Sequence, residues 1–227
     1  MKLVLQLLAN IAGMAVVFAL VLFLPAGTWT WPAGWVFFAL FFGFVLALSF
    51  WLLRFNPELM AERLSGVGRQ DQKTWDKVLL AVVGTSFFGW LALMGVDAAR
   101  FHWSHLPVGL QVMGAALLVA SFWMFYLTFR FNPFLSPAVR VQTERSQTVV
   151  DTGPYRYVRH PMYAAFVLFT FATAMLLGSW WGVAASLVLV VMVAVRAALE
   201  ERMLREELAG YDAYARRVRY RLIPFVW

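Results

Sequence analysis

The stretch MYAAFVLFTFATAMLLGSWWGVAASLVLVVMVAV, residues 162–195, contains no charged side chain. It divides into two apolar segments, 162–178 and 180–196, around the sequence Gly-Ser-Trp-Trp-Gly. Because glycine interrupts helices, we interpret it as a tight helical hairpin, or as one long helix broken at its middle. A hairpin returns its two ends to the same membrane surface, so residues 151–163 and 196–224 are expected to meet there.

Four more apolar segments precede this stretch and cover roughly 3–24, 33–53, 78–98 and 107–129. Each has the length of about 20 residues that a membrane-spanning helix needs. The chain is 62% hydrophobic and only 14% charged, unlike a soluble domain. We therefore predict an all-α integral membrane protein with about six transmembrane helices. Residues 1–130 would form an N-terminal four-helix region, and residues 131–227 a C-terminal region containing the hairpin.

The basic residues predict an orientation in the membrane. With six spans, 18 of the 19 Lys and Arg residues fall on one side and only Arg100 falls on the other. The positive-inside tendency then places both termini in the cytoplasm. A five-span arrangement would put the arginines of the tail outside, and we reject it for that reason. We attribute the net charge of +7 to contact with anionic lipid headgroups and expect no nucleic-acid partner.

A short motif occurs twice in the chain. Arg-Phe-Asn-Pro follows the second span at 54–57 and the fourth span at 130–133. The pattern favours a shared helix stop, in which the arginine reaches the headgroups and Asn-Pro ends the helix. A duplicated two-helix unit stays open as the alternative, since four matching residues do not establish it.

The longest polar segments, 130–161 and the tail, carry the candidate functional residues. Pro161 can start the fifth span, which places His160 at the membrane surface. Arg196 and Glu200 are spaced i,i+4 on one face of a helix that leaves the membrane. Ionisable groups at that depth are costly unless they pair with one another or hold a ligand.

Simpler structural interpretations exist for the same residues. Arg156 and Arg159 suit lipid-surface anchors, and Arg196 with Glu200 suits a surface ion pair. Tyr211 and Tyr214 would pack an amphipathic tail helix. Trp75-Asp76-Lys77, at the end of the loop 63–77, suggests the start of the third span. The alternative interpretation is that this loop covers a bound cofactor. The absence of cysteine excludes disulfides and thiolate metal sites, and we predict no metal site.

Five short motifs near the C-terminus resemble a known family. They are Gly153-Pro154-Tyr155, Arg159-His160-Pro161-Met162-Tyr163, Arg196-x-x-x-Glu200-Glu201, Tyr211-x-x-Tyr214 and Ile223-Pro224. Together they resemble the isoprenylcysteine carboxyl methyltransferase family, which has bacterial and archaeal members and is similar to the phospholipid methyltransferases. The resemblance covers about residues 140–227. The chain departs from it at Ala165, where a glycine often stands, and at Gln147, where eukaryotic members have histidine.

The resemblance implies a membrane-embedded S-adenosylmethionine site in a cytoplasmic, helical C-terminal region, without a Rossmann fold. Carried over by motif position, the catalytic residues are Arg196 and His160, with Arg196 on the substrate side. The cofactor contacts are Gln142, Gln147, Thr148, Val149, Val150, Tyr155, His160, Pro161, Met162, Tyr163 and Glu200. It also implies the inner membrane of a bacterial or archaeal cell as the location.

The chemistry of the acceptor decides which side chains are needed. A carboxylate needs no general base and only an arginine to orient it, for which Arg196 is the candidate. An amine needs a base, and His160 is then the first to test. We predict a lipophilic acceptor that enters from the bilayer, and we favour a carboxylate; its identity and the oligomeric state stay open. The alternatives are an NADPH-dependent membrane reductase of the sterol-reductase type and a non-enzymatic membrane carrier.

Overall fold

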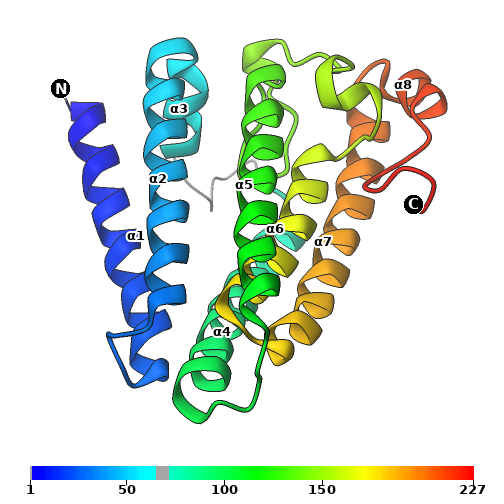
Figure 1. Ribbon diagram of the computed structural model, residues 1–227. Coiled ribbons are helices and arrows are strands. Elements are labelled where there is room, and N and C mark those ends of the chain that lie inside the picture. The colour runs from blue at the N-terminus through cyan, green and yellow to red at the C-terminus, as the bar shows by residue number, and fades with distance from the viewer. Residues whose placement is uncertain (1, 65–71) are drawn as a thin grey trace.

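The computed structural model describes residues 2–64 and 72–227, so residues 65–71 of the loop 63–77 lie outside the described residues. The regular elements in the described ranges are helices (Figure 1). In chain order they are α1 (Lys2–Ala26), α2 (Pro32–Phe55), α3 (Pro57–Leu64), α4 (Thr74–Met94), the π-helix η1 (Gly95–Phe101), α5 (Val108–Phe131), the 3-10 turns η2 (Thr143–Arg145) and η3 (Gly153–Arg156), α6 (Pro161–Leu177), α7 (Trp180–Glu207) and α8 (Tyr211–Arg217).

The prediction of an all-α integral membrane protein is confirmed. Among the described residues, five helices are long and apolar enough to cross a membrane: α1, α2, α4 with η1, α5 and α7. The fifth predicted span, α6, is apolar but has only 17 residues. At 1.5 Å per residue it covers about 25 Å, less than the hydrocarbon thickness of about 30 Å. It is short because the chain before Pro161 is an irregular segment that borders the pocket described below.

The segments that connect the helices lie at two opposite ends of the bundle (Figure 1). The links from α1 to α2, from α4 to α5 and from α6 to α7 lie at one end, at the bottom of the view. α3, residues 132–160 and α8 lie at the opposite end. The chain therefore alternates between the two ends as a six-span arrangement requires, and the 18-to-1 split of Lys and Arg residues assumes that arrangement. The cytoplasmic location of the upper end stays a prediction.

α6 and α7 form a tight helical hairpin, which is the first of the two interpretations, and not one long helix broken at its middle. Gly178 adopts a left-handed conformation with φ +82°, which ends α6. The Ser179 N–H donates to the carbonyl of Ala174 at 3.0 Å, and the Ser179 hydroxyl accepts from the Gly182 N–H at 2.7 Å, capping α7. The chain therefore reverses within two residues, and α7 packs back on α6.

The two Arg-Phe-Asn-Pro copies both end helices, so the shared helix stop is confirmed. α2 ends at Phe55 and α5 ends at Phe131. The side-chain oxygen of Asn56 accepts from the Leu59 N–H at 3.2 Å, and that of Asn132 accepts from the Phe134 N–H at 2.9 Å. After the first copy the chain starts α3, which the sequence interpretation missed although proline is favoured at a first helical position.

α5 lies unusually close to α6 because of Gly114. A Cβ on this residue would stand 2.4 Å from the backbone nitrogen of Leu176, so no side chain fits there. Ala172 and Ala174 of α6 are fully buried near this contact. Interfaces of small residues are the usual means of close helix approach in membranes, where van der Waals packing drives association. The rest of the core is strongly aromatic and includes Phe18, Phe37, Phe42, Trp90, Phe122 and Phe169.

A buried carboxylate ties the bundle together at the end away from α8. Asp97, in η1, is fully buried. Its Oδ2 accepts from the Ser104 hydroxyl at 2.7 Å and from the Ser179 hydroxyl at 2.5 Å. The Ser104 hydroxyl in turn accepts from the Trp180 N–H at 2.9 Å. Asp97 thus joins the end of the third span to the turn of the hairpin.

We predict that Asp97→Ala lowers the free energy of unfolding. The substitution leaves two buried serine hydroxyls without their acceptor, and each such group costs about 1–3 kcal/mol. Thermal unfolding of detergent-purified protein should show a clearly lower midpoint. Asp212→Ala is the matched control, since its exposed ion pair with Arg205 contributes about 0–1 kcal/mol. Equal midpoints for Asp97→Ala and the wild type would contradict this role.

Candidate active site

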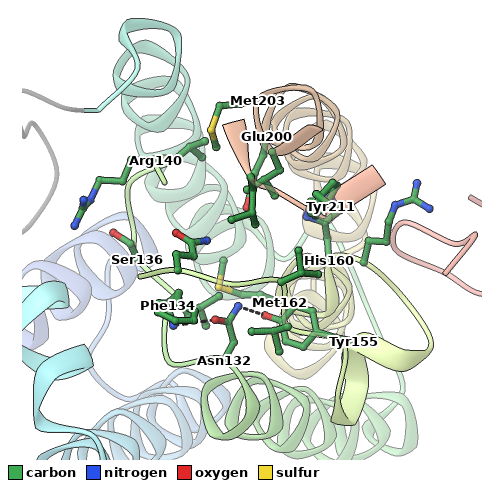
Figure 2. A pocket seen from close by; sticks show the side chains of 18 of the residues that line it. Asn132, Phe134, Ser136, Arg140, Tyr155, His160, Met162, Glu200, Met203 and Tyr211 are labelled. Carbon is green, nitrogen blue, oxygen red and sulfur yellow. Dashed lines mark hydrogen bonds between the residues drawn. The ribbon is translucent and has the colours of Figure 1, made fainter. Parts of the chain in front are cut away.

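A pocket lies where residues 132–163 meet α7 and α8. It contains about 810 Å³ of empty space, part of it open to solvent. In Figure 2, Asn132 and Tyr155 border one side, joined by a hydrogen bond, and Glu200 and Met203 of α7 border the other.

Most of the site residues predicted from the sequence line this pocket together. They are Gln147, Thr148, Val149, Val150, Tyr155, His160, Pro161, Met162, Tyr163, Arg196 and Glu200. They come from the irregular segment after α5, the first turn of α6 and the last turns of α7. The expectation that residues 151–163 and 196–224 meet is confirmed, since His160 and Glu200 border the same space.

Gln142 has a different position from the one expected. It is fully buried and is not among the side chains that line the pocket. Its side-chain nitrogen donates to the carbonyl of Phe134 at 2.6 Å, and its side-chain oxygen accepts from Arg145 at 2.8 Å. Its backbone N–H donates to the side-chain oxygen of Gln147 at 2.8 Å. Gln142 therefore holds the loop that presents Gln147 and touches the pocket only through it.

Arg196 is held by three partners. Its Nε donates to Asp76 Oδ1 at 2.9 Å, and its Nη2 donates to the carbonyl of Pro137 at 2.8 Å. Its Nη1 donates to the hydroxyl of Tyr163 at 2.9 Å, and that hydroxyl donates to Glu200 Oε2 at 2.5 Å. The interpretation of Arg196 with Glu200 as a surface ion pair is wrong: Tyr163 stands between them and Arg196 is buried.

Glu200 and Glu201 are neighbours with different environments. Glu200 faces the pocket. Glu201 is buried and accepts from Arg159 at 3.0 Å, from Arg205 at 2.9 Å and from Arg221 at 2.8 Å. Arg159 is therefore not a lipid-surface anchor, because it is buried and also donates to the carbonyl of Val218 at 2.6 Å. Glu201 attaches the chain after α8 to the start of α6.

His160 contributes an unsatisfied polar atom to the pocket wall. Its backbone N–H donates to the carbonyl of Arg221 at 2.9 Å, which fixes the residue just before α6. Its buried Nε2 has no hydrogen-bond partner within residues 2–64 and 72–227, and Glu201 Oε2 is 3.9 Å away. Burial holds the pKa of His160 below its ordinary value, against the opposite effect of Glu200 and Glu201. The ring is therefore neutral near pH 7.

Tyr211, at the start of α8, supplies a second unsatisfied group. Its hydroxyl is buried and has no hydrogen-bond partner among the side chains and backbone groups that the structure describes. Burial raises the pKa of Tyr211, so the hydroxyl keeps its proton. Its neighbour Tyr214 donates to the carbonyl of Tyr155 at 2.9 Å. Both tyrosines pack α8 as the structural interpretation expects, and both also line the pocket.

The geometry can be set against a known protein family. Residues 108–209 match the family model described as phospholipid methyltransferase. We refer to these residues, a little under half of the chain, as the phospholipid methyltransferase domain. That family includes isoprenylcysteine carboxyl methyltransferase-like proteins, so the resemblance seen in the sequence motifs is confirmed. No curated protein matches the chain. The domain runs from α5 to the end of α7 and contains every site residue predicted from the sequence.

Several residues of the site were missed in the sequence. Asn132 donates to the Tyr155 hydroxyl at 2.8 Å, yet its motif was interpreted only as a helix stop. Asp76, which pairs with Arg196, was interpreted as part of a helix start, and α4 does begin there at Thr74. Asp76 and the two tail tyrosines lie outside the methyltransferase domain. The tyrosines belong to the Tyr211-x-x-Tyr214 motif noted in the sequence, whereas only the folded structure connects Asp76 with Arg196.

We predict a specific acid sensitivity from His160. Because the pKa of His160 is lower in the folded protein, the unfolded chain binds a proton more readily. Stability from this residue is complete above its ordinary pKa of about 6.5 and declines as the pH falls below that value. The difference in thermal midpoint between wild type and His160→Asn should therefore shift in favour of the variant from pH 7.5 to pH 5.5. A difference that is constant across this range would contradict a buried, neutral His160.

Proposed function

We propose that the protein is an S-adenosylmethionine-dependent methyltransferase whose acceptor is a lipophilic carboxylate. The observation that carries the proposal is the pocket of the methyltransferase domain, which assembles Glu200, His160, Tyr163 and Arg196 around one space. The phospholipid methyltransferase domain supports a membrane methyltransferase. The use of S-adenosylmethionine as the cofactor and of a carboxylate as the acceptor is what we propose in addition.

The pocket residues suit the cofactor's mixed character. The Glu200 carboxylate suits an ammonium group or ribose hydroxyls, and the unpaired His160 Nε2 and Tyr211 hydroxyl are buried polar atoms that need partners. Val149, Val150 and Leu204 supply an apolar surface for a heterocyclic base. S-adenosylmethionine, when bound, supplies a methyl group already activated by a sulfonium centre. The protein then has to align the acceptor and exclude water.

Arg196 is placed to orient a carboxylate. Of its five N–H donors, Nε and one on each terminal nitrogen are engaged by Asp76, Tyr163 and Pro137. One N–H on each terminal nitrogen remains, and a carboxylate can accept from such a pair with both oxygens. The neutral His160 is available as a base if the acceptor is an amine, which gives the test a second arm.

A second cavity supports a lipophilic acceptor. It contains about 1270 Å³ of empty space and lies among α1, α2, α4, α5 and α6. Its lining is mostly apolar and includes Phe18, Phe41, Phe87, Phe122 and Phe169. Met162 lines both this cavity and the pocket of the methyltransferase domain. An acceptor with an apolar tail in the cavity would have its polar end beside Met162, next to Tyr163.

We predict that Glu200→Gln weakens S-adenosylmethionine binding about 10- to 150-fold, because a charge-assisted hydrogen bond contributes about 1.5–3 kcal/mol. Isothermal titration of detergent-purified protein measures this, with NADPH titrated in parallel. Arg202→Ala is the matched control, since Arg202 is an exposed residue on the same helix and donates to Glu206. Binding of NADPH alone would replace the proposal with the reductase.

We predict that Arg196→Lys separates binding from transfer. Lysine keeps a positive charge opposite Asp76 but lacks the planar fork that grips a carboxylate. Cofactor affinity should stay within about tenfold, or 1.4 kcal/mol, while transfer to an S-farnesylcysteine carboxylate should fall at least about 100-fold. The assay follows radiolabelled methyl groups, with an aminophospholipid as the second acceptor. Transfer to the amine alone, unaffected by Arg196→Lys, would contradict the carboxylate.

A further inference from the structure

Asp76 is a buried carboxylate at the start of α4, outside the methyltransferase domain. It is fully buried, although it lies far from the pocket residues in the sequence. Its Oδ1 accepts from Arg196 Nε at 2.9 Å. The ion pair joins the N-terminal helices to the one arginine that borders the pocket from α7.

The second oxygen of Asp76 is fixed as firmly as the first. Its Oδ2 accepts from the backbone N–H of Val139 at 2.9 Å and from the side chain of Gln72 at 2.8 Å. The carboxylate is therefore held by α4, by the chain just before it and by the segment after α5. A carboxylate with both oxygens engaged has one orientation, and it imposes that orientation on its arginine.

The contact of Asp76 with Arg196 Nε affects the orientation of the whole guanidinium group. Nε is one of three nitrogens in a rigid plane, so binding there and at Pro137 sets how the remaining N–H groups of Nη1 and Nη2 are presented. The Tyr163 hydroxyl then accepts a hydrogen bond from Nη1 and donates one to Glu200. Without Asp76, Arg196 would be a buried cation with no carboxylate directly bonded to it, and its guanidinium plane would lose the contact that orients it.

We propose that Asp76 is a positioning residue for acceptor binding, acting through Arg196. The proposal rests on the proposed function, because it assigns Asp76 to the side of the site where Arg196 meets the acceptor carboxylate. It gives the first helices a part in the reaction beyond anchoring the domain in the membrane. The cofactor side, formed by residues 147–155, His160 and Glu200, does not depend on Asp76.

The test uses Asp76→Asn in full-length protein, with Asp212→Asn as the matched control. Asp212→Asn makes the same chemical change at an exposed carboxylate whose partner is Arg205, so the contact between Asp76 and Arg196 stays intact. For Asp76→Asn we expect kcat/KM for S-farnesylcysteine to fall about 100-fold, with the cofactor Kd changed less than about threefold. Asp212→Asn should stay within about threefold of wild type in both quantities, as expected for a surface substitution.

A double variant keeps the test decisive if Asp76→Asn alone does not fold. Asp76→Asn combined with Arg196→Gln removes both charges of the buried pair. If Asp76 acts only through Arg196, this double variant transfers methyl groups as fast as Arg196→Gln alone. A further loss of tenfold or more in the double variant would overturn the proposal.

The outcomes separate the two proposals. A wild-type protein that binds no S-adenosylmethionine and methylates no acceptor overturns the proposed function. A wild-type protein that needs Arg196 for transfer, while Asp76→Asn keeps wild-type kcat/KM, overturns only the role of Asp76. Equal losses of cofactor and acceptor binding in Asp76→Asn, with a lowered thermal midpoint, would show a structural role and also overturn it.

Discussion

The last turns of α7 bring three charged side chains into the packed part of the protein. Arg196, Glu200 and Glu201 all lie where ionised groups are costly unless they are paired. Each is satisfied by a different part of the chain: Arg196 by Asp76 and Pro137, Glu200 by Tyr163, and Glu201 by Arg159, Arg205 and Arg221. The need to satisfy these charges is the constraint that gathers α4, the segment after α5, the start of α6 and the tail around one helix.

The same contacts divide the site's polar groups into two kinds. Glu201 is surrounded by arginines and serves the structure, whereas Glu200 bonds to one hydroxyl and faces the pocket. The His160 Nε2 and the Tyr211 hydroxyl are buried at the pocket wall without partners in the described ranges. Buried polar atoms are nearly always satisfied in native proteins, so these groups are the ones expected to meet a ligand.

The fold was largely predictable because membrane helices follow from apolar length and helix-ending residues. The hairpin was anticipated from Gly178 and its neighbours, and the helix stops from the two Arg-Phe-Asn-Pro motifs. α6 has the 17 residues of the predicted segment, whereas α7 continues to Glu207, beyond the predicted end at residue 196. α3 was missed because eight polar-leaning residues lack a strong periodic signal. The pocket residues from Gln147 to Glu200 were found through motifs. Gln142 was placed at the pocket by the same motifs, but its side chain instead holds the loop.

The amino-acid sequence by itself determined the apolar spans, the turn of the hairpin and the grouping of Arg196, Glu200 and His160 at one end of it. These depend on local composition and on helix periodicity, which act over a few residues. Only the tertiary structure decided that Glu200 faces the pocket while Glu201 faces three arginines, and that Asp76 holds Arg196 across a separation of 120 residues. The reason is that buried charges are satisfied by whichever segments packing brings beside them, and no local pattern records that choice.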